Sequence, residues 1–183
     1  MTSLAGQLLI AMPQMQDPRF MRSVIFMCAH NAEGAMGLVI NKTVEQPSMA
    51  DVLKQLGIAA DGFRSAQVHF GGPVESGRGF VLHSPDYTED GTLMVDGRVG
   101  LTTTMDVLRA IGRGEGPRRR LFALGYAGWG PGQLDAEIQA NGWLHVAADD
   151  ELIFDETLDD KWRRAIAKLG VDPAALSGDA GHA

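Results

Sequence analysis

Several features that define whole classes of protein are scarce or missing in this chain of 183 residues. A single cysteine, Cys28, rules out an intramolecular disulfide and therefore a disulfide-stapled scaffold. The longest apolar runs are four to six residues, whereas a membrane-spanning helix needs about 20. No basic side chain precedes Arg19, so no secretory leader is visible. We therefore expect a cytoplasmic protein that does not contact a membrane.

Basic residues are also few, because 16 Lys and Arg face 23 Asp and Glu and leave a net charge of -7. Such a charge weakens attraction to nucleic acid and to anionic lipid. Residues 133–160 hold nine acids and no Lys or Arg, while six arginines cluster further upstream. These arginines are Arg98, Arg109, Arg113, Arg118, Arg119 and Arg120. Since no aromatic interleaving, zinc finger or helix-turn-helix pattern accompanies them, a solvated or partner-facing surface is favoured over nucleic-acid binding.

Short apolar runs bounded by turn residues are abundant, and they predict β-strands. The expected strands cover residues 6–11, 23–30, 35–41, 67–71, 79–83, 93–95, 120–127, 143–147 and 152–154. Four further segments combine helical spacing of apolar residues with capping residues. They run over residues 48–57, from 103 or 104 to 112, over 131–141 and over 157–170, and at most one more turn starts at 172.

The order of these segments predicts a single α+β domain over residues 1–183, with residues 177–183 as a C-terminal tail. Strands that follow one another directly favour antiparallel pairing. Helices do not alternate strictly with strands, so a doubly wound parallel sheet is disfavoured. We expect a mixed, largely antiparallel sheet with flanking helices.

The segment at 125–137 (GYAGWGPGQLDAE) leads from a strand through a glycine-rich loop into a helix, as in many phosphate-binding sites. It lacks the lysine of a P-loop and the GxGxxG spacing, and the acids Asp135 and Glu137 would repel an anion. We interpret Gly128, Gly130 and Gly132 as permitting close backbone approach beside Trp129. No nucleotide or other cofactor is expected.

Residues 71–74 (GGPV) form a second glycine and proline element, which is typical of a turn. The alternative is a ligand loop in which Glu75 and Arg78 face a shared cleft. Such a cleft would form where GGPV approaches residues 125–133 (GYAGWGPGQ). The polar groups expected there are Tyr126, Gln133, Glu137 and His69.

Residues that could supply a nucleophile or a metal ligand do not form a recognisable set. Cys28 lies in an apolar strand pattern, which is typical of a buried side chain. Ser23 and Ser76 lack the GxSxG elbow of serine hydrolases. The histidines have no metal-binding spacing, although His69 and His83 could meet on adjacent strands. We expect no catalytic residue and no metal site.

Several motifs together resemble the YqgE/AlgH family of bacterial proteins. They are GQLLIAMP with DPRF and SVIF, then GAMGLVIN, GGPV, GYAGWGPGQLDAEI with NGW, FDE followed by KW, and the closing GHA. They follow the family's order over essentially the whole chain. The resemblance implies a compact α+β domain whose branched sheet folds into a pseudo-barrel. It implies no defined activity, although some members carry a name that suggests transcriptional regulation.

The positions that match the family's motifs are the candidate ligand-binding or partner-binding residues. They are Gly71, Gly72, Pro73, Tyr126, Trp129, Gln133, Glu137, Trp143 and His182, and the cleft hypothesis adds His69. The leading interpretation is a non-enzymatic binding or regulatory protein for an unidentified protein partner or small ligand. One alternative is an enzyme or small-molecule binder that uses the cleft between GGPV and GYAGWGPGQ, and another is a DNA-binding regulator.

Overall fold

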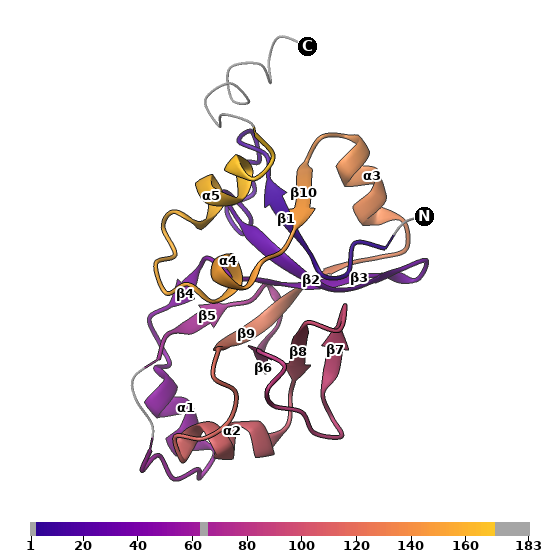
Figure 1. Cartoon of the computed structure of the whole chain (residues 1–183). Helices are drawn as coiled ribbons and strands as arrows, with labels where there is room; N and C mark the ends of the chain where they lie inside the picture. Colours follow the sequence, from indigo (N-terminus) through magenta and orange to yellow (C-terminus); the bar gives the residue numbers. More distant parts are fainter. Residues whose placement is uncertain (1–2, 63–65, 171–183) are drawn as a thin grey trace.

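The computed structural model of the chain describes residues 3–62 and 66–170, which Figure 1 shows in colour. Its strands are β1 (Gln7–Ala11), β2 (Val24–Asn31), β3 (Gly34–Val39), β4 (Thr43–Val44), β5 (Val68–Phe70), β6 (Val74–His83), β7 (Leu93–Val95), β8 (Val99–Thr102), β9 (Arg120–Trp129) and β10 (Trp143–Ala147). Its helices are α1 (Met49–Gln55), α2 (Met105–Gly112), α3 (Gln133–Gln139), α4 (Asp150–Phe154) and α5 (Lys161–Ala167). Within these described ranges, no helix is both long and apolar enough to cross a membrane.

One sheet organises the fold, in the order β10-β1-β2-β3-β9-β6-β8-β7, with β5 and then β4 attached beside β9. The sheet branches at β9, because residues 122–124 pair with β5 on one edge and with β6 on the other, while residues 127–129 pair with β3. Among the described strands only β5 and β9 pair in parallel. The sheet curls into a half-barrel (Figure 1). The expected fold class, α+β with a mixed, largely antiparallel branched sheet, is confirmed.

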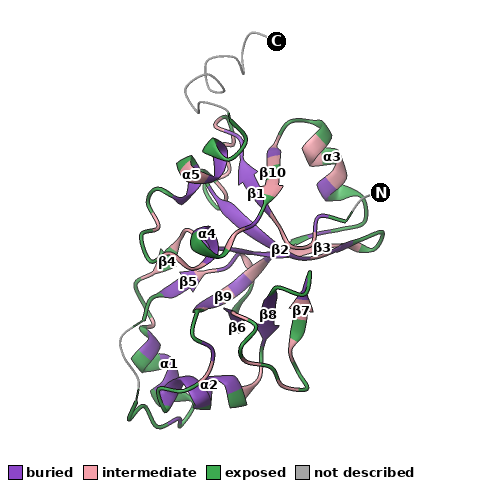
Figure 2. Ribbon diagram, in the orientation of Figure 1, coloured by how far each residue is buried: buried purple, intermediate pink, exposed green. Residues whose placement is uncertain are grey.

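Both faces of β1 are buried, which explains why its sequence is a continuous apolar run rather than an alternating pattern. Leu8 and Ile10 pack on one face in the same core cluster as Trp162 of α5. Leu9 and Ala11 pack on the other face, in the cluster that contains the tryptophans of β9 and β10. A third cluster joins α1 and α2 to β5, β6 and β9. Figure 2 shows these buried surfaces in purple.

The expected strand at residues 152–154 is wrong, because these residues belong to α4. The Asp149 side chain accepts the Leu152 N–H at 2.8 Å and so caps the helix. Leu152 and Ile153 are both buried in the same core cluster. Consecutive residues of a strand would point to opposite faces, so this packing requires a helical turn.

Other element boundaries differ less. The N-cap expected at Ser48 is present, and together with Asp51 it forms a reciprocal capping box. The last helix begins at Lys161 rather than at residue 157, because the Asp155 carboxylate holds the Thr157 N–H in a preceding turn. Strand β6 begins at Val74, and β4 and β8 are additional strands. The turn expected from residue 172 and the tail at 177–183 lie outside the described residues.

Candidate functional site

The two glycine segments meet in the structure through close packing of backbone. A Cβ on Gly71 would lie 2.3 Å from the carbonyl oxygen of Gly125, and one on Gly72 would lie 2.1 Å from the carbonyl carbon of Tyr126. The Gly71 N–H donates to the Leu124 carbonyl at 2.9 Å. Only glycine can therefore hold the GGPV segment this close to β9.

The glycines that make this close approach are not those expected. A Cβ on Gly130 would come no nearer than 3.9 Å to its surroundings, and one on Gly132 would meet nothing within 4 Å. Gly132 instead has a φ of 72° at the N-cap of α3, a left-handed conformation that favours glycine. The interpretation of Gly130 and Gly132 as close-packing residues is wrong, and Gly71, Gly72 and Gly125 take that role.

A cleft of about 490 Å³ opens beside these segments, and we call it the tryptophan cleft. Its lining residues are Met15, Asp17, Arg19, Phe20, Pro73, Val74, Gly128, Trp129, Gln133, Glu137, Ala140, Gly142 and Trp143. It therefore brings together five residues of the expected set, namely Pro73, Trp129, Gln133, Glu137 and Trp143. Both glycine segments contribute to its walls.

Glu137 organises the polar side of the tryptophan cleft. Its Oε1 accepts the indole N–H of Trp129 at 3.0 Å and that of Trp143 at 2.9 Å. Its Oε2 accepts the side-chain amide of Gln133 at 2.9 Å, because the two residues are four positions apart on α3 and share a face. The side-chain Oε1 of Gln133 accepts the Gly130 N–H at 3.0 Å. One carboxylate thus connects α3, β9 and β10.

Three aromatic rings of the cleft lining stand at steep angles to one another. The centroids of Trp129 and Trp143 are 6.0 Å apart with an interplanar angle of 79°. Phe20 stands 5.8 Å from Trp143 at 73°. Trp129 is 8% exposed and Trp143 is 2% exposed, so both indoles are held in place by the core as well as by Glu137. The orientation of the two indoles that line the tryptophan cleft is therefore fixed by the fold itself.

Charge in the tryptophan cleft is unbalanced. Asp17 and Arg19 form an ion pair at 2.7 Å, and the Arg19 guanidinium lowers the pKa of the Asp17 carboxyl. Glu137 forms no ion pair with any residue in the described part of the chain. The lining therefore carries one carboxylate charge that no neighbouring cation neutralises.

Tyr126 lies on the other side of β9 from the tryptophan cleft, in a more open groove. That groove has a volume of about 640 Å³ and shares Val74, Gly128 and Trp129 with the tryptophan cleft. Burial, followed by the hydrogen bond to Glu75, raises the pKa of the Tyr126 hydroxyl. Arg78 lines this groove and pairs with Glu75 at 3.6 Å. Glu75 and Arg78 are therefore paired near Tyr126, but of the two only Arg78 lines the groove.

His69 lines a separate and smaller cavity of about 70 Å³. Its Nδ1–H donates to the Phe122 carbonyl at 3.3 Å. Burial and then the charge of Lys161 lower the pKa of His69 to about 4. The expected meeting of His69 with His83 does not occur, because β9 lies between their strands and His83 binds Thr102 at 2.7 Å. His182 lies outside the described residues.

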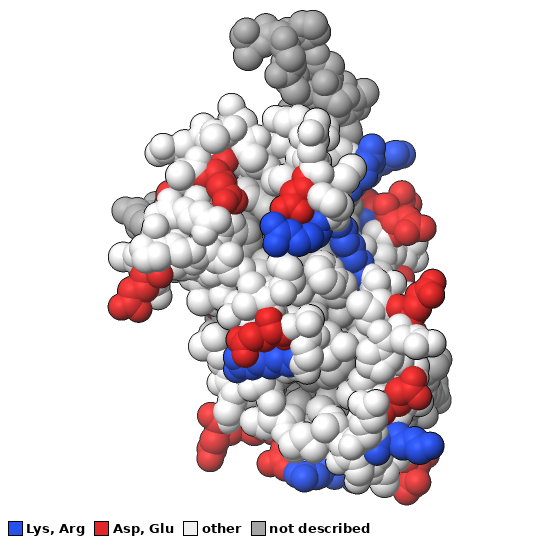
Figure 3. Space-filling model, turned by 180° about the vertical axis from the view of Figure 1, so that it is seen from behind, with Lys and Arg blue, Asp and Glu red and all other residues white. Residues whose placement is uncertain are grey.

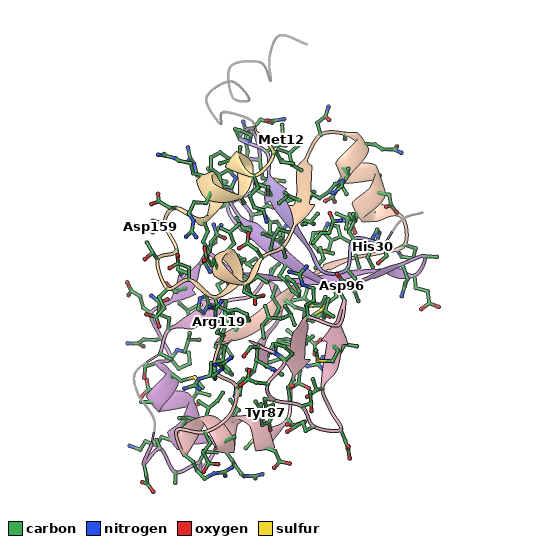
Figure 4. The ribbon with its side chains drawn as sticks, in the orientation of Figure 1. Met12, His30, Tyr87, Asp96, Arg119 and Asp159 are labelled. Atoms are coloured by element: carbon green, nitrogen blue, oxygen red, sulfur yellow. The ribbon has the colours of Figure 1, made fainter. Side chains whose placement is uncertain are left out.

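Residues of the 12–23 loop, including Asp17, Arg19 and Phe20, belong to the cleft although the sequence gives no sign of it. A further residue without a sequence signal is His30, whose position next to α3 can be followed in Figure 4. Its Nδ1 accepts the Leu4 N–H at 3.0 Å, and its Nε2 lies 3.4 Å from the Asp135 carboxylate. It therefore ties β2 to the helix that carries Glu137.

Cys28 and the arginine cluster do not form sites. Burial raises the pKa of the Cys28 thiol to about 12, so the thiolate needed for nucleophilic attack is not populated near neutral pH. Arg109 pairs with Asp106, and Arg113 pairs with Glu115. On the face shown in Figure 3, Lys and Arg side chains are interspersed with Asp and Glu side chains. The two ion pairs reduce the positive charge that residues 98–120 could present to DNA.

Comparison with known proteins identifies the relatives of this chain. The family model described as AlgH-like matches residues 8–174. A UPF0301 protein of Rhodospirillum rubrum is 56% identical over 181 residues, which cover 98% of this chain and 94% of the relative. The solution structure of the AlgH protein from Pseudomonas aeruginosa is 43% identical, with a TM-score of 0.79 over 100% of this chain and 97% of that one. A Corynebacterium diphtheriae protein that is 18% identical shares the fold, with a TM-score of 0.74 over 90% of this chain and 86% of that one.

Proposed function

The chain belongs to the AlgH-like family, and we propose that it is a non-enzymatic binding protein whose tryptophan cleft holds a small organic ligand. The observation that carries this proposal is the cleft itself, in which both glycine segments frame two indoles held by one carboxylate. Ligand sites in proteins commonly have volumes of about 300–1,000 Å³ and aromatic walls with a few placed polar groups. The tryptophan cleft, at about 490 Å³, has these properties.

The Glu137 network supports binding rather than catalysis. Its hydrogen bonds orient the indoles of Trp129 and Trp143 before any ligand arrives, and such preorganisation lowers the entropic cost of binding. The three donors already occupy most of the acceptor capacity of the carboxylate. Neither the Cys28 thiol nor the His69 imidazole lines this cleft.

A titration monitored by the indole N–H signals of the protein tests the proposal. The chain has three tryptophans, and Trp162 provides an internal reference because it packs in a different core cluster and donates to the Ala11 carbonyl at 2.8 Å. Benzyl alcohol, benzylamine and benzoate serve as probes, and single Trp→Phe variants assign the signals.

We expect at least one probe to shift the Trp129 and Trp143 signals in a saturable way while the Trp162 signal stays in place. The proposal is wrong if no probe shifts the two cleft signals, or if all three indole signals move together.

A further inference from the structure

The hydrogen bonds that Glu137 accepts do not neutralise its negative charge. All three groups that donate to the carboxylate are neutral, namely two indoles and one amide. A carboxylate has about four acceptor positions, and Oε2 receives one hydrogen bond from the described residues, so this oxygen can still accept. A half-buried carboxylate without a counter-ion is costly, and a cation that binds beside it recovers part of that cost.

The remaining charges of the lining do not neutralise Glu137. The charged residues of the tryptophan cleft are Asp17, Arg19 and Glu137, of which the first two pair with each other. The lining therefore has a formal charge of one negative unit. Lys42 adds a positive charge on the far side of that pair, where its Nζ donates to the Arg19 carbonyl at 3.3 Å. The attraction for a cation is therefore local to Glu137, the one charged lining residue without an ion pair among the described residues.

The aromatic rings favour an organic cation over a metal ion. The rings and Pro73 offer apolar surface to an organic molecule, which a bare metal ion could not use. Aromatic rings attract cations through their faces, whereas the two indoles turn their N–H edges towards Glu137, so the carboxylate supplies the attraction for the charged group. The Arg19 guanidinium already lies 5.5 Å from the centroid of Phe20 at the edge of the cleft. Over the described residues there is no cluster of His, Cys, Asp and Glu side chains suited to a metal ion. A volume of about 490 Å³ also fits an organic molecule rather than a bare ion.

Building on the proposed function, we propose that the tryptophan cleft selects small organic cations, meaning primary or quaternary ammonium compounds with an apolar body. The ammonium group lies next to the free acceptor position of Glu137 Oε2, and the apolar body contacts the rings and Pro73. Neutral molecules of the same shape bind less tightly because they leave the carboxylate charge unpaired.

Matched pairs of probes separate charge from shape. Choline is compared with 3,3-dimethylbutan-1-ol, and benzylamine with benzyl alcohol, by calorimetry and by the Trp129 and Trp143 indole signals. We expect each cation to bind at least tenfold more tightly than its neutral partner, and the difference to shrink as salt is added. Glu137→Gln should abolish the difference, whereas Glu45→Gln, at an exposed acid outside the cleft, should preserve it.

The outcomes distinguish the two proposals. If neutral and cationic partners bind equally well, or if the neutral ones bind better, the inference about cations is wrong and the binding function stands. If none of the four probes, nor benzoate, reaches the cleft, both proposals are wrong. The comparison within wild-type protein does not depend on whether Glu137→Gln folds.

Discussion

Replacing Glu137 with alanine should destabilise the protein far more than a half-exposed residue near the end of a short helix normally would. The substitution removes the acceptor of two indole N–H groups whose side chains are 8% and 2% exposed. Each buried donor left without a partner costs about 1–3 kcal/mol. The free energy of unfolding should therefore fall by roughly 2–6 kcal/mol, on the same principle.

Urea unfolding, followed by far-UV circular dichroism, measures this loss. Glu137→Gln keeps a carbonyl oxygen that can accept both indoles, so its cost should be about 1 kcal/mol, the difference between a charged and a neutral acceptor. Glu45→Ala removes an exposed carboxylate and should change stability by less than about 0.5 kcal/mol. If Glu137→Ala is no more destabilising than Glu45→Ala, the carboxylate does not hold the two indoles and our description of the cleft is wrong.

Three further predictions concern other parts of the fold. Gly72→Ala should lower the free energy of unfolding in urea by at least about 2 kcal/mol, because the added Cβ would lie 2.1 Å from the Tyr126 carbonyl carbon. Gly77→Ala, where a Cβ would meet nothing within 4 Å, should leave it nearly unchanged, and equal effects of the two substitutions would contradict the close packing at Gly72. Burial lowers the pKa of Lys161 from 10.5 to about 8, so the unfolded chain holds this proton more tightly and the free energy of unfolding should rise between pH 8 and 10.5. Lys161→Met should remove that rise, and an unchanged dependence of the free energy of unfolding on pH would refute the prediction. The imidazole of His69 should titrate near pH 4 by NMR, so its contribution to stability falls as pH drops from 6.5 towards 4; a midpoint near 6.5 would show that the ring is solvated.

Much of the fold follows from local sequence signals. The apolar run at Leu8 to Ala11 predicts a strand buried on both faces, and Ser48 with Asp51 predicts the start of the first helix. The failure at residues 152–154 has a physical cause, because three apolar residues are too few to show a period. In this segment the N-cap from Asp149 and the burial of both Leu152 and Ile153 in one core cluster favour a helix. The branching of the sheet at β9 depends on pairings distant in sequence, which no local pattern reports.

The candidate site was accessible from sequence only in part. The family motifs single out Pro73, Trp129, Gln133, Glu137 and Trp143, and the structure places these five residues around one cleft. Tyr126 points to the opposite side of β9, since successive residues of a strand alternate between faces. His69 and the 12–23 loop could not be placed correctly, because their positions depend on how distant strands pair. The wider set of family motifs, by contrast, correctly indicated the AlgH-like family.

The most direct test of the central claim is a crystal structure of the protein grown with benzylamine. We expect the ligand in the tryptophan cleft, with its ammonium group within hydrogen-bond distance of Glu137 Oε2 and its ring against Phe20 or Pro73. Well-defined ligand in the groove beside Tyr126 or in the His69 cavity, with the tryptophan cleft holding only solvent, would contradict the account.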